Sequence, residues 1–113
     1  MLKADRIRLQ HMLDAASDAV TFTKRRKRKN LDADKMFLFS LVKAIEIIGE
    51  AASQVSAATK KARPEIAWAE IITMRHRLVH AYYDINTDTV WNTVKEDLPP
   101  LIAQLKAVLK LRE

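Results

Sequence analysis

The chain has 113 residues, 49% of them hydrophobic, which is enough for one domain with its own apolar core. It contains no cysteine, which excludes disulfide bonds and thiolate zinc sites, and its first residues are charged, unlike a secretion signal. No uncharged apolar run reaches the roughly 18 residues of a membrane span, so we expect a single cytoplasmic domain over residues 1–113 that does not enter a membrane.

The composition predicts an all-α protein without a sheet. Strong helix formers dominate the sequence, whereas glycine occurs once and proline three times. The first expected helix covers residues 2–22, because apolar residues recur there at the spacing of one helix face, namely Leu9, Met12, Leu13, Ala16 and Val20.

A run of six basic residues follows this helix. It accounts for the whole net charge of +6, since the other 14 basic residues are balanced by 14 acidic ones. Such a run attracts phosphates or an acidic protein surface, although it is equally typical of a solvated loop. We expect a loop that binds RNA phosphates, made of Lys24, Arg25, Arg26, Lys27, Arg28 and Lys29.

Two long helices are expected next. One runs from Asp32 to Ala57, and its broad apolar surface is typical of a central helix with several neighbours. The other begins with Pro64, whose missing N–H is harmless in a first helical turn, and ends near Asp84.

The last part of the chain predicts a fourth helical segment capped by Asn86 or Thr87. Pro99 and Pro100 should kink this segment or restart it as a final helix that runs toward Arg112. The whole pattern favours an antiparallel up-and-down bundle of four to five helices.

The stretch "MRHRLVHAYYD", residues 74–84, collects two arginines, two histidines and two tyrosines. On a continuous helix, Arg75 falls in the middle of an apolar arc, where a guanidinium needs a carboxylate, a ligand phosphate or a subunit interface. Glu46 and Glu50, one helical turn apart, are the candidate structural partners of Arg75 within the chain.

The same helical wheel places His76, His80 and Tyr83 on a second stripe at the border with solvent. His80 then lies about 140° around the helix from Arg75, so the two side chains diverge within one chain. A two-fold homodimer would bring Arg75 of one protomer near His80 of its partner.

An arginine and a histidine are a suitable set for cleaving RNA without a metal or cofactor. The histidine moves a proton to or from a ribose or leaving oxygen, while the arginine stabilises charge on the phosphorus. The alternative is that Arg75 forms a structural salt bridge and that the histidines are ordinary surface residues. The sequence holds no convincing cluster of metal ligands.

Arg75, His80 and Tyr82 together resemble the Arg-x4-His-x-Tyr motif of the HEPN superfamily, and more closely that of its HepT toxin subfamily. Further similar segments occur in the family's order over most of the chain: "IEIIGEAA" at 45–52, the segment 64–71, "VW" at 90–91 and "LPPL" at 98–101. The resemblance implies a HEPN-like helical fold and a toxin with endoribonuclease activity. It also implies catalysis by Arg75 and His80.

The resemblance further implies a partner, a small nucleotidyltransferase antitoxin that transfers AMP to a tyrosine of the toxin. Tyr82 matches the acceptor position, and Tyr83 is the substitute candidate. The chain departs from the family pattern at His76, commonly asparagine, which adds a possible supporting catalytic group, and at Ala67, usually proline. Two other functions stay open: a noncatalytic HEPN subunit that binds nucleotide or serves as a scaffold, and a helical protein that binds nucleic acid through residues 24–29.

Overall fold

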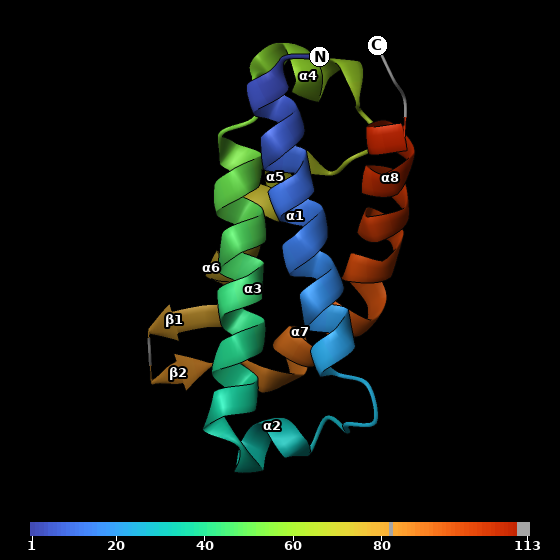
Figure 1. Cartoon of the computed structure of the whole chain (residues 1–113). Coiled ribbons are helices and arrows are strands. Elements are labelled where there is room, and N and C mark those ends of the chain that lie inside the picture. The colour runs from blue at the N-terminus through green and yellow to red at the C-terminus, as the bar shows by residue number, and fades with distance from the viewer. Residues whose placement is uncertain (82, 111–113) are drawn as a thin grey trace.

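The computed structural model describes residues 1–81 and 83–110. Its longest helices are α1 (Lys3–Phe22), α3 (Lys35–Ser53) and α8 (Leu98–Lys110). Helix α1 packs against both α3 and α8, so the three run side by side along the molecule (Figure 1). The expected all-α, HEPN-like class is therefore confirmed. No helix of the described residues combines the length and apolar character needed to cross a membrane.

The core lies between these helices. Each contributes fully buried side chains at the spacing of one helix face, among them Leu9, Met12, Leu41, Ile45, Ile48, Leu98 and Leu105. Burying one such side chain contributes about 1.5–3 kcal/mol, so the packed faces give α1 and α3 a fixed relative position. Residues on the outer edges of these two helices are therefore held at a fixed spacing.

Polar caps set the ends of several helices. Asp34 accepts a hydrogen bond from the Phe37 amide (3.1 Å) and starts α3, which ends at Ser53 and is shorter than the expected Asp32–Ala57. Ser56 caps α4 (Ala57–Ala62) by accepting from the Thr59 amide (3.3 Å). Between residue 22 and α3, the chain forms the single turn α2 (Asn30–Ala33).

The fourth helical segment also has its cap. Asn86 accepts a hydrogen bond from the Thr89 amide (3.0 Å) and starts α7 (Thr87–Asn92). The chain continues through a wider π-helical turn, η1 (Thr93–Asp97), into α8. The final helix expected toward Arg112 begins at Leu98 without a break from the preceding turn, and Pro99 and Pro100 lie in its first turn.

The expected helix from Pro64 to Asp84 is wrong. Pro64 lies in a turn, and helix resumes only as α5 (Trp68–Ile72) and α6 (Met74–Leu78). Beyond Leu78 the chain forms a hairpin of two short antiparallel strands, β1 (Val79–Ala81) and β2 (Asp84–Ile85). The expectation of no sheet is therefore also wrong, and the helical stripe of His76, His80 and Tyr83 does not exist.

Local contacts explain the break. The Thr73 hydroxyl donates to the Ala69 carbonyl (2.8 Å), a contact that bends helices, and Thr73 itself separates α5 from α6. Gly49 on α3 allows the α5 backbone to come close, since a Cβ there would lie 3.2 Å from the Ile71 carbonyl oxygen. After α6, the β-branched Val79 favours extended backbone, and the Asn86 amide donates to the Leu78 carbonyl (2.7 Å).

A buried carboxylate joins the start of α1 to α4. Asp5 is 2% exposed and accepts hydrogen bonds from the Ser56 amide (2.9 Å), the Ser56 hydroxyl (2.6 Å) and the Thr59 hydroxyl (2.6 Å). Burial by itself raises the pKa of Asp5, but these hydrogen bonds outweigh it and hold the pKa below its ordinary value. The ionised form is therefore the one that stabilises the fold.

Replacing Asp5 with asparagine should lower the free energy of unfolding by about 1–3 kcal/mol at neutral pH, because three donors lose their charged acceptor. Because the pKa of Asp5 is lower in the folded state than in the unfolded state, its ionised form stabilises the fold at pH values above the ordinary carboxyl range. This stabilisation is lost as the pH falls through the pKa of the folded state. The difference between wild type and variant should thus shrink in acid. Urea unfolding across pH measures this, with exposed Asp18→Asn as the control. A difference that does not change with pH would contradict the assignment.

Candidate active site

Arg75 projects from α6 toward α3. Its Nε lies 3.2 Å from Oε2 of Glu46, and its side chain is 45% exposed. The expected position in the middle of an apolar arc is wrong, because the break at Thr73 ends the continuous helix on which that arc was drawn. Within residues 1–81 and 83–110, Arg75 makes no other hydrogen bond or ion pair, which leaves its two terminal nitrogens available to a ligand.

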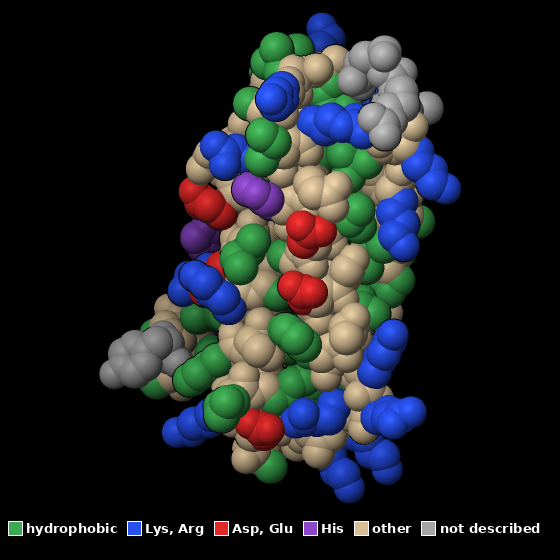
Figure 2. Space-filling view, viewed as in Figure 1, with side chains coloured by type: hydrophobic (Ala, Val, Ile, Leu, Met, Phe, Trp, Pro, Cys, Tyr) green, Lys and Arg blue, Asp and Glu red, His purple; other side chains and the backbone are tan. Residues whose placement is uncertain are grey.

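A groove of about 510 Å³ opens beside this ion pair, between α1, α3 and the α5–α6 segment. Figure 2 shows the α1–α3 face, where histidine side chains lie close to both cationic and acidic ones. Arg75, His76, Glu46 and Glu50 all line the groove. Glu50 accepts a hydrogen bond from Gln54 (3.1 Å), and of the two expected partners it is Glu46 that pairs with the guanidinium.

His80 lies apart from this groove. It sits on β1 with a side chain that is 75% exposed, and its Nδ1 is 3.6 Å from Oδ2 of Asp84 on the neighbouring strand. In Figure 1 the hairpin projects sideways from the helices. Because His80 is absent from the groove lining, the structure brings Arg75 together with His76 but not with His80 of the same chain.

The two tyrosine candidates follow β1. Tyr82 lies outside the described residues, so neither its position on the apolar face nor its role as AMP acceptor is tested. Tyr83 is 79% exposed at the tip of the hairpin. The hairpin therefore carries His80 and at least one tyrosine at the surface.

The basic run forms a loop between α1 and α2, as expected, and its six side chains fall into two groups. Arg26 pairs with Asp34 (3.0 Å) and lies over the Phe37 ring, 4.0 Å from its centroid. Lys24, Arg25, Lys27 and Lys29 are exposed. None of the six lines the groove beside Arg75.

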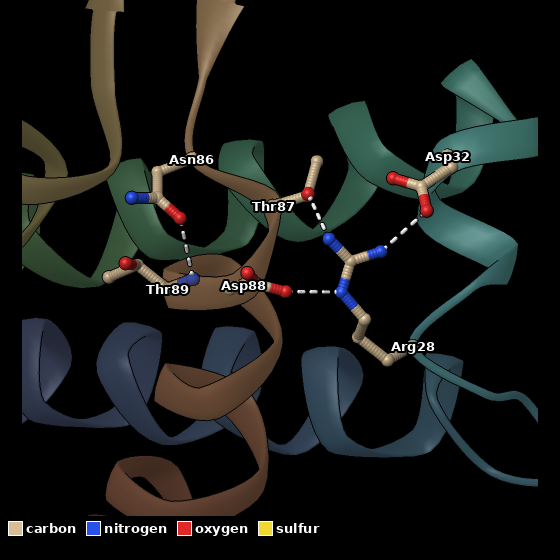
Figure 3. A network of polar contacts seen from close by, with 6 residues as sticks. All are labelled: Arg28, Asp32, Asn86, Thr87, Asp88 and Thr89. Atoms are coloured by element: carbon tan, nitrogen blue, oxygen red, sulfur yellow. Dashed lines mark hydrogen bonds and ion pairs between the residues drawn. The ribbon is translucent and has the colours of Figure 1, made fainter.

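Arg28 is the second anchor of this loop (Figure 3). Its guanidinium donates to Asp32 of α2 (2.6 Å), to the Thr87 hydroxyl (2.6 Å) and to Asp88. Thr87 and Asp88 form the start of α7, which directly follows the hairpin. Arg28 therefore links the basic loop to the base of the segment that carries His80.

Sequence reasoning missed three further ionisable residues at the groove: Arg8 and His11 on α1, and Lys43 on α3. Each lies beside an apolar stripe, where a polar residue is usually solvated. Arg8 and His11 are three residues apart, a spacing that places both on one helix face. Nothing in the pattern, however, indicates which edge of α3 that face meets.

No group of three or more His, Asp or Glu side chains within residues 1–81 and 83–110 is placed to hold a metal ion. The ionisable groups of the groove are instead guanidinium, ammonium, imidazole and carboxylate. Such a set can bind an anion and transfer protons.

Comparison with known proteins gives the family. The chain matches the family described as ribonuclease HepT-like over residues 12–108. A protein of Thermococcus cleftensis named "Probable ribonuclease HepT" is 34% identical over 90% of this chain and 93% of its own length. "Putative RNase MJ1380" of Methanocaldococcus jannaschii is 31% identical over 88% of this chain and 92% of its own length.

A third relative, from Caldanaerobacter subterraneus subsp. tengcongensis, is 28% identical over 96% of this chain and carries an RNase name. No solved structure matches the chain. At the level of the family, the expected enzyme class of an RNA-cleaving nuclease is confirmed. The match over residues 12–108, with relatives that align over nearly their full length, shows that the chain belongs to the HepT-like family of ribonucleases.

Proposed function

We propose that the chain is the toxin of a toxin–antitoxin pair, and that it acts in the cytoplasm as a homodimeric endoribonuclease without a metal ion. The observation that carries the proposal is Arg75, whose guanidinium edges a groove and is held only through Nε among the described residues. A guanidinium fixed in this way presents its remaining N–H groups to a phosphate.

In the proposed reaction, the 2′-hydroxyl of a ribose attacks the adjacent phosphorus and the bond from phosphorus to the 5′-oxygen breaks. His80 accepts the hydroxyl proton or protonates the leaving oxygen, and Arg75 stabilises the charge that develops on the phosphorane. Oδ2 of Asp84 lies 3.6 Å from Nδ1 of His80, too far for a hydrogen bond but close enough to attract a positively charged ring. The products are a 2′,3′-cyclic phosphate and a 5′-hydroxyl. His76, beside Arg75, is the second candidate for proton transfer.

The proposed dimer places His80 of one protomer at the groove of the other. Two properties of His80 support this: it does not line the groove of its own chain, and it is exposed on a projecting hairpin (Figure 1). A two-fold arrangement repeats the same contact twice and so forms two composite sites.

The purified chain should cleave single-stranded RNA to fragments with cyclic phosphate ends, and a chelator should leave the rate unchanged, because Arg75 supplies the positive charge at the phosphate. Gel analysis of end-labelled RNA with and without chelator measures both. Cleavage that stops when the chelator is added would contradict the metal-free chemistry, and intact RNA under all conditions would contradict the enzyme.

For control of the toxin, we propose a nucleotidyltransferase antitoxin that transfers AMP to Tyr82, with Tyr83 as the substitute acceptor. A bulky adenylate on this hairpin would place negative charge beside His80 and repel RNA. After coexpression with a small nucleotidyltransferase, the mass of the chain should rise by one adenylyl group, and Tyr82→Phe should abolish the increase. Loss of the increase in Tyr83→Phe instead would move the acceptor to Tyr83.

The basic loop is proposed to raise affinity for RNA through Lys24, Arg25, Lys27 and Lys29. Changing all four to glutamine should weaken RNA binding and make its salt dependence shallower, by a slope of about 0.7 for each phosphate that is no longer neutralised. In a comparison variant, Arg26 and Arg28 are changed to glutamine. This variant should lower the stability of the fold instead, because both arginines are engaged with carboxylates. If the four-residue variant keeps its RNA affinity but binds the antitoxin more weakly, the loop docks an acidic protein face.

A further inference from the structure

The groove beside Arg75 carries a second set of anion-binding groups. Arg8 and His11 reach it from α1 and Lys43 reaches it from α3, so the set faces Arg75 and His76 across the same depression. The core fixes the spacing of α1 and α3, which means that these groups are held together by the fold rather than by flexible loops.

Arg8, His11 and Lys43 have no hydrogen-bond or ion-pair partner among residues 1–81 and 83–110. Arg26 and Arg28 differ in this respect, since both are engaged with carboxylates. Arg8 is half-buried as a residue and has no ion pair within the described part of the chain. His11 and Lys43 are exposed, and the three unpaired groups around one depression are open to an external anion.

The carboxylates of the groove do not cancel this charge. Glu46 is paired with Arg75, and Glu50 accepts from Gln54. Arg8, Lys43 and Arg75 supply three cationic side chains against these two acidic ones, so the groove is cationic before any histidine is protonated. An incoming phosphate therefore meets net positive charge.

The size and walls of the groove fit a nucleotide segment. Its volume of about 510 Å³ falls within the range of roughly 300–1,000 Å³ that is common for ligand pockets. Apolar side chains, Ile47 and Ile72 among them, lie between the polar groups and offer a surface for ribose or base. A positively charged groove that follows the backbone is typical of proteins that bind a single strand.

We propose that Arg8, His11 and Lys43 form a subsite that binds the RNA backbone at a phosphate next to the one contacted by Arg75. The RNA strand then lies along the α1–α3 groove, and the subsite positions the scissile phosphate at Arg75. This subsite rests on the proposed ribonuclease function, because its ligand is the substrate of that reaction.

The test uses a single-stranded oligonucleotide with 2′-O-methyl groups, which keeps every phosphate but cannot undergo attack by a 2′-oxygen. Binding by the wild-type chain is compared with binding by the double variant Arg8→Gln/Lys43→Gln across a range of salt. Affinity should fall roughly tenfold, and the salt slope should become shallower by about 1.4 if each residue contacts one phosphate. The single variant His11→Gln should weaken binding by a smaller factor.

The matched control is Lys61→Gln/Lys106→Gln, which removes the same charge from exposed sites on α4 and α8 outside the groove. The swap Arg8→Lys/Lys43→Arg keeps the charge and should restore most of the affinity, which separates weaker phosphate binding from a folding defect. Equal decreases in the double variant and its control would overturn the subsite and leave only general electrostatic attraction.

The remaining outcomes separate the subsite from the function it rests on. A wild-type chain that cleaves RNA while Arg8→Gln/Lys43→Gln binds normally would overturn the subsite alone. A wild-type chain that neither binds nor cleaves RNA would overturn both. If the double variant keeps its RNA affinity and binds a nucleotidyltransferase antitoxin more weakly, the groove is a protein docking site and the subsite is wrong.

Discussion

Replacing His80 with alanine is expected to lower RNA cleavage by about 10²-fold or more, the scale for losing a general acid or base. Arg75→Ala should have an effect of about 10²–10³-fold, because the developing charge on the phosphorane loses its donor. Both side chains are exposed, and within the described part of the chain each has one ion-pair contact, so the variants should fold with unchanged helicity. Initial cleavage rates and circular dichroism measure the two properties.

Arg77→Ala is the matched control for Arg75, because Arg77 is an exposed arginine of the same helix that does not line the groove. Its cleavage rate should stay within a small factor of wild type. His76→Asn tests the supporting role of His76, and a decrease comparable to that of His80→Ala would give both histidines a part in proton transfer. Full activity of His80→Ala with an inactive His76→Asn would transfer the catalytic role to the histidine inside the groove.

The long helices can be predicted from the sequence because their stability depends on the spacing of apolar residues. The stripe of Leu9, Met12 and Ala16 is directly readable, and α1 lies at Lys3–Phe22 against an expected 2–22. The segment after Pro64 differs from its expected helix for a physical reason. Its apolar residues suit a helix over their whole length, whereas the backbone breaks at Thr73 through a side-chain contact and the close approach permitted by Gly49.

The candidate site can be predicted only in part. The predicted pairing of Arg75 with a carboxylate of α3 forms, with Glu46 as the partner, although the continuous helix that placed Arg75 on an apolar arc does not. The position of Arg8, His11 and Lys43 at the groove could not be predicted. It depends on which edges of α1 and α3 meet, and the apolar pattern of a single helix does not contain that information. Likewise, the sequence does not distinguish Arg26 and Arg28 from the other residues of the basic run. In the structure, Arg26 pairs with Asp34, and Arg28 pairs with Asp32 and Asp88.

Mixing the two inactive chains Arg75→Ala and His80→Ala is expected to restore cleavage. If each site takes Arg75 from one protomer and His80 from its partner, a mixed dimer has one intact site and one site without either group. Random exchange at equal amounts makes about half of the dimers mixed, so activity should recover to about a quarter of wild type. Light scattering should give about twice the chain mass of 12.9 kDa.

The control for this complementation is a chain with both changes, mixed with wild type. In a shared site, every mixed dimer then lacks Arg75 or His80 at each of its two sites, and activity should fall below that of the wild-type protein added. In a site contained within one chain, the wild-type protomer would keep its full activity in the mixed dimer, and the two single variants would stay inactive when combined. A shared site therefore predicts a gain of activity in the first mixture and a loss in the second, whereas a site within one chain predicts neither. An active monomer would contradict the shared site.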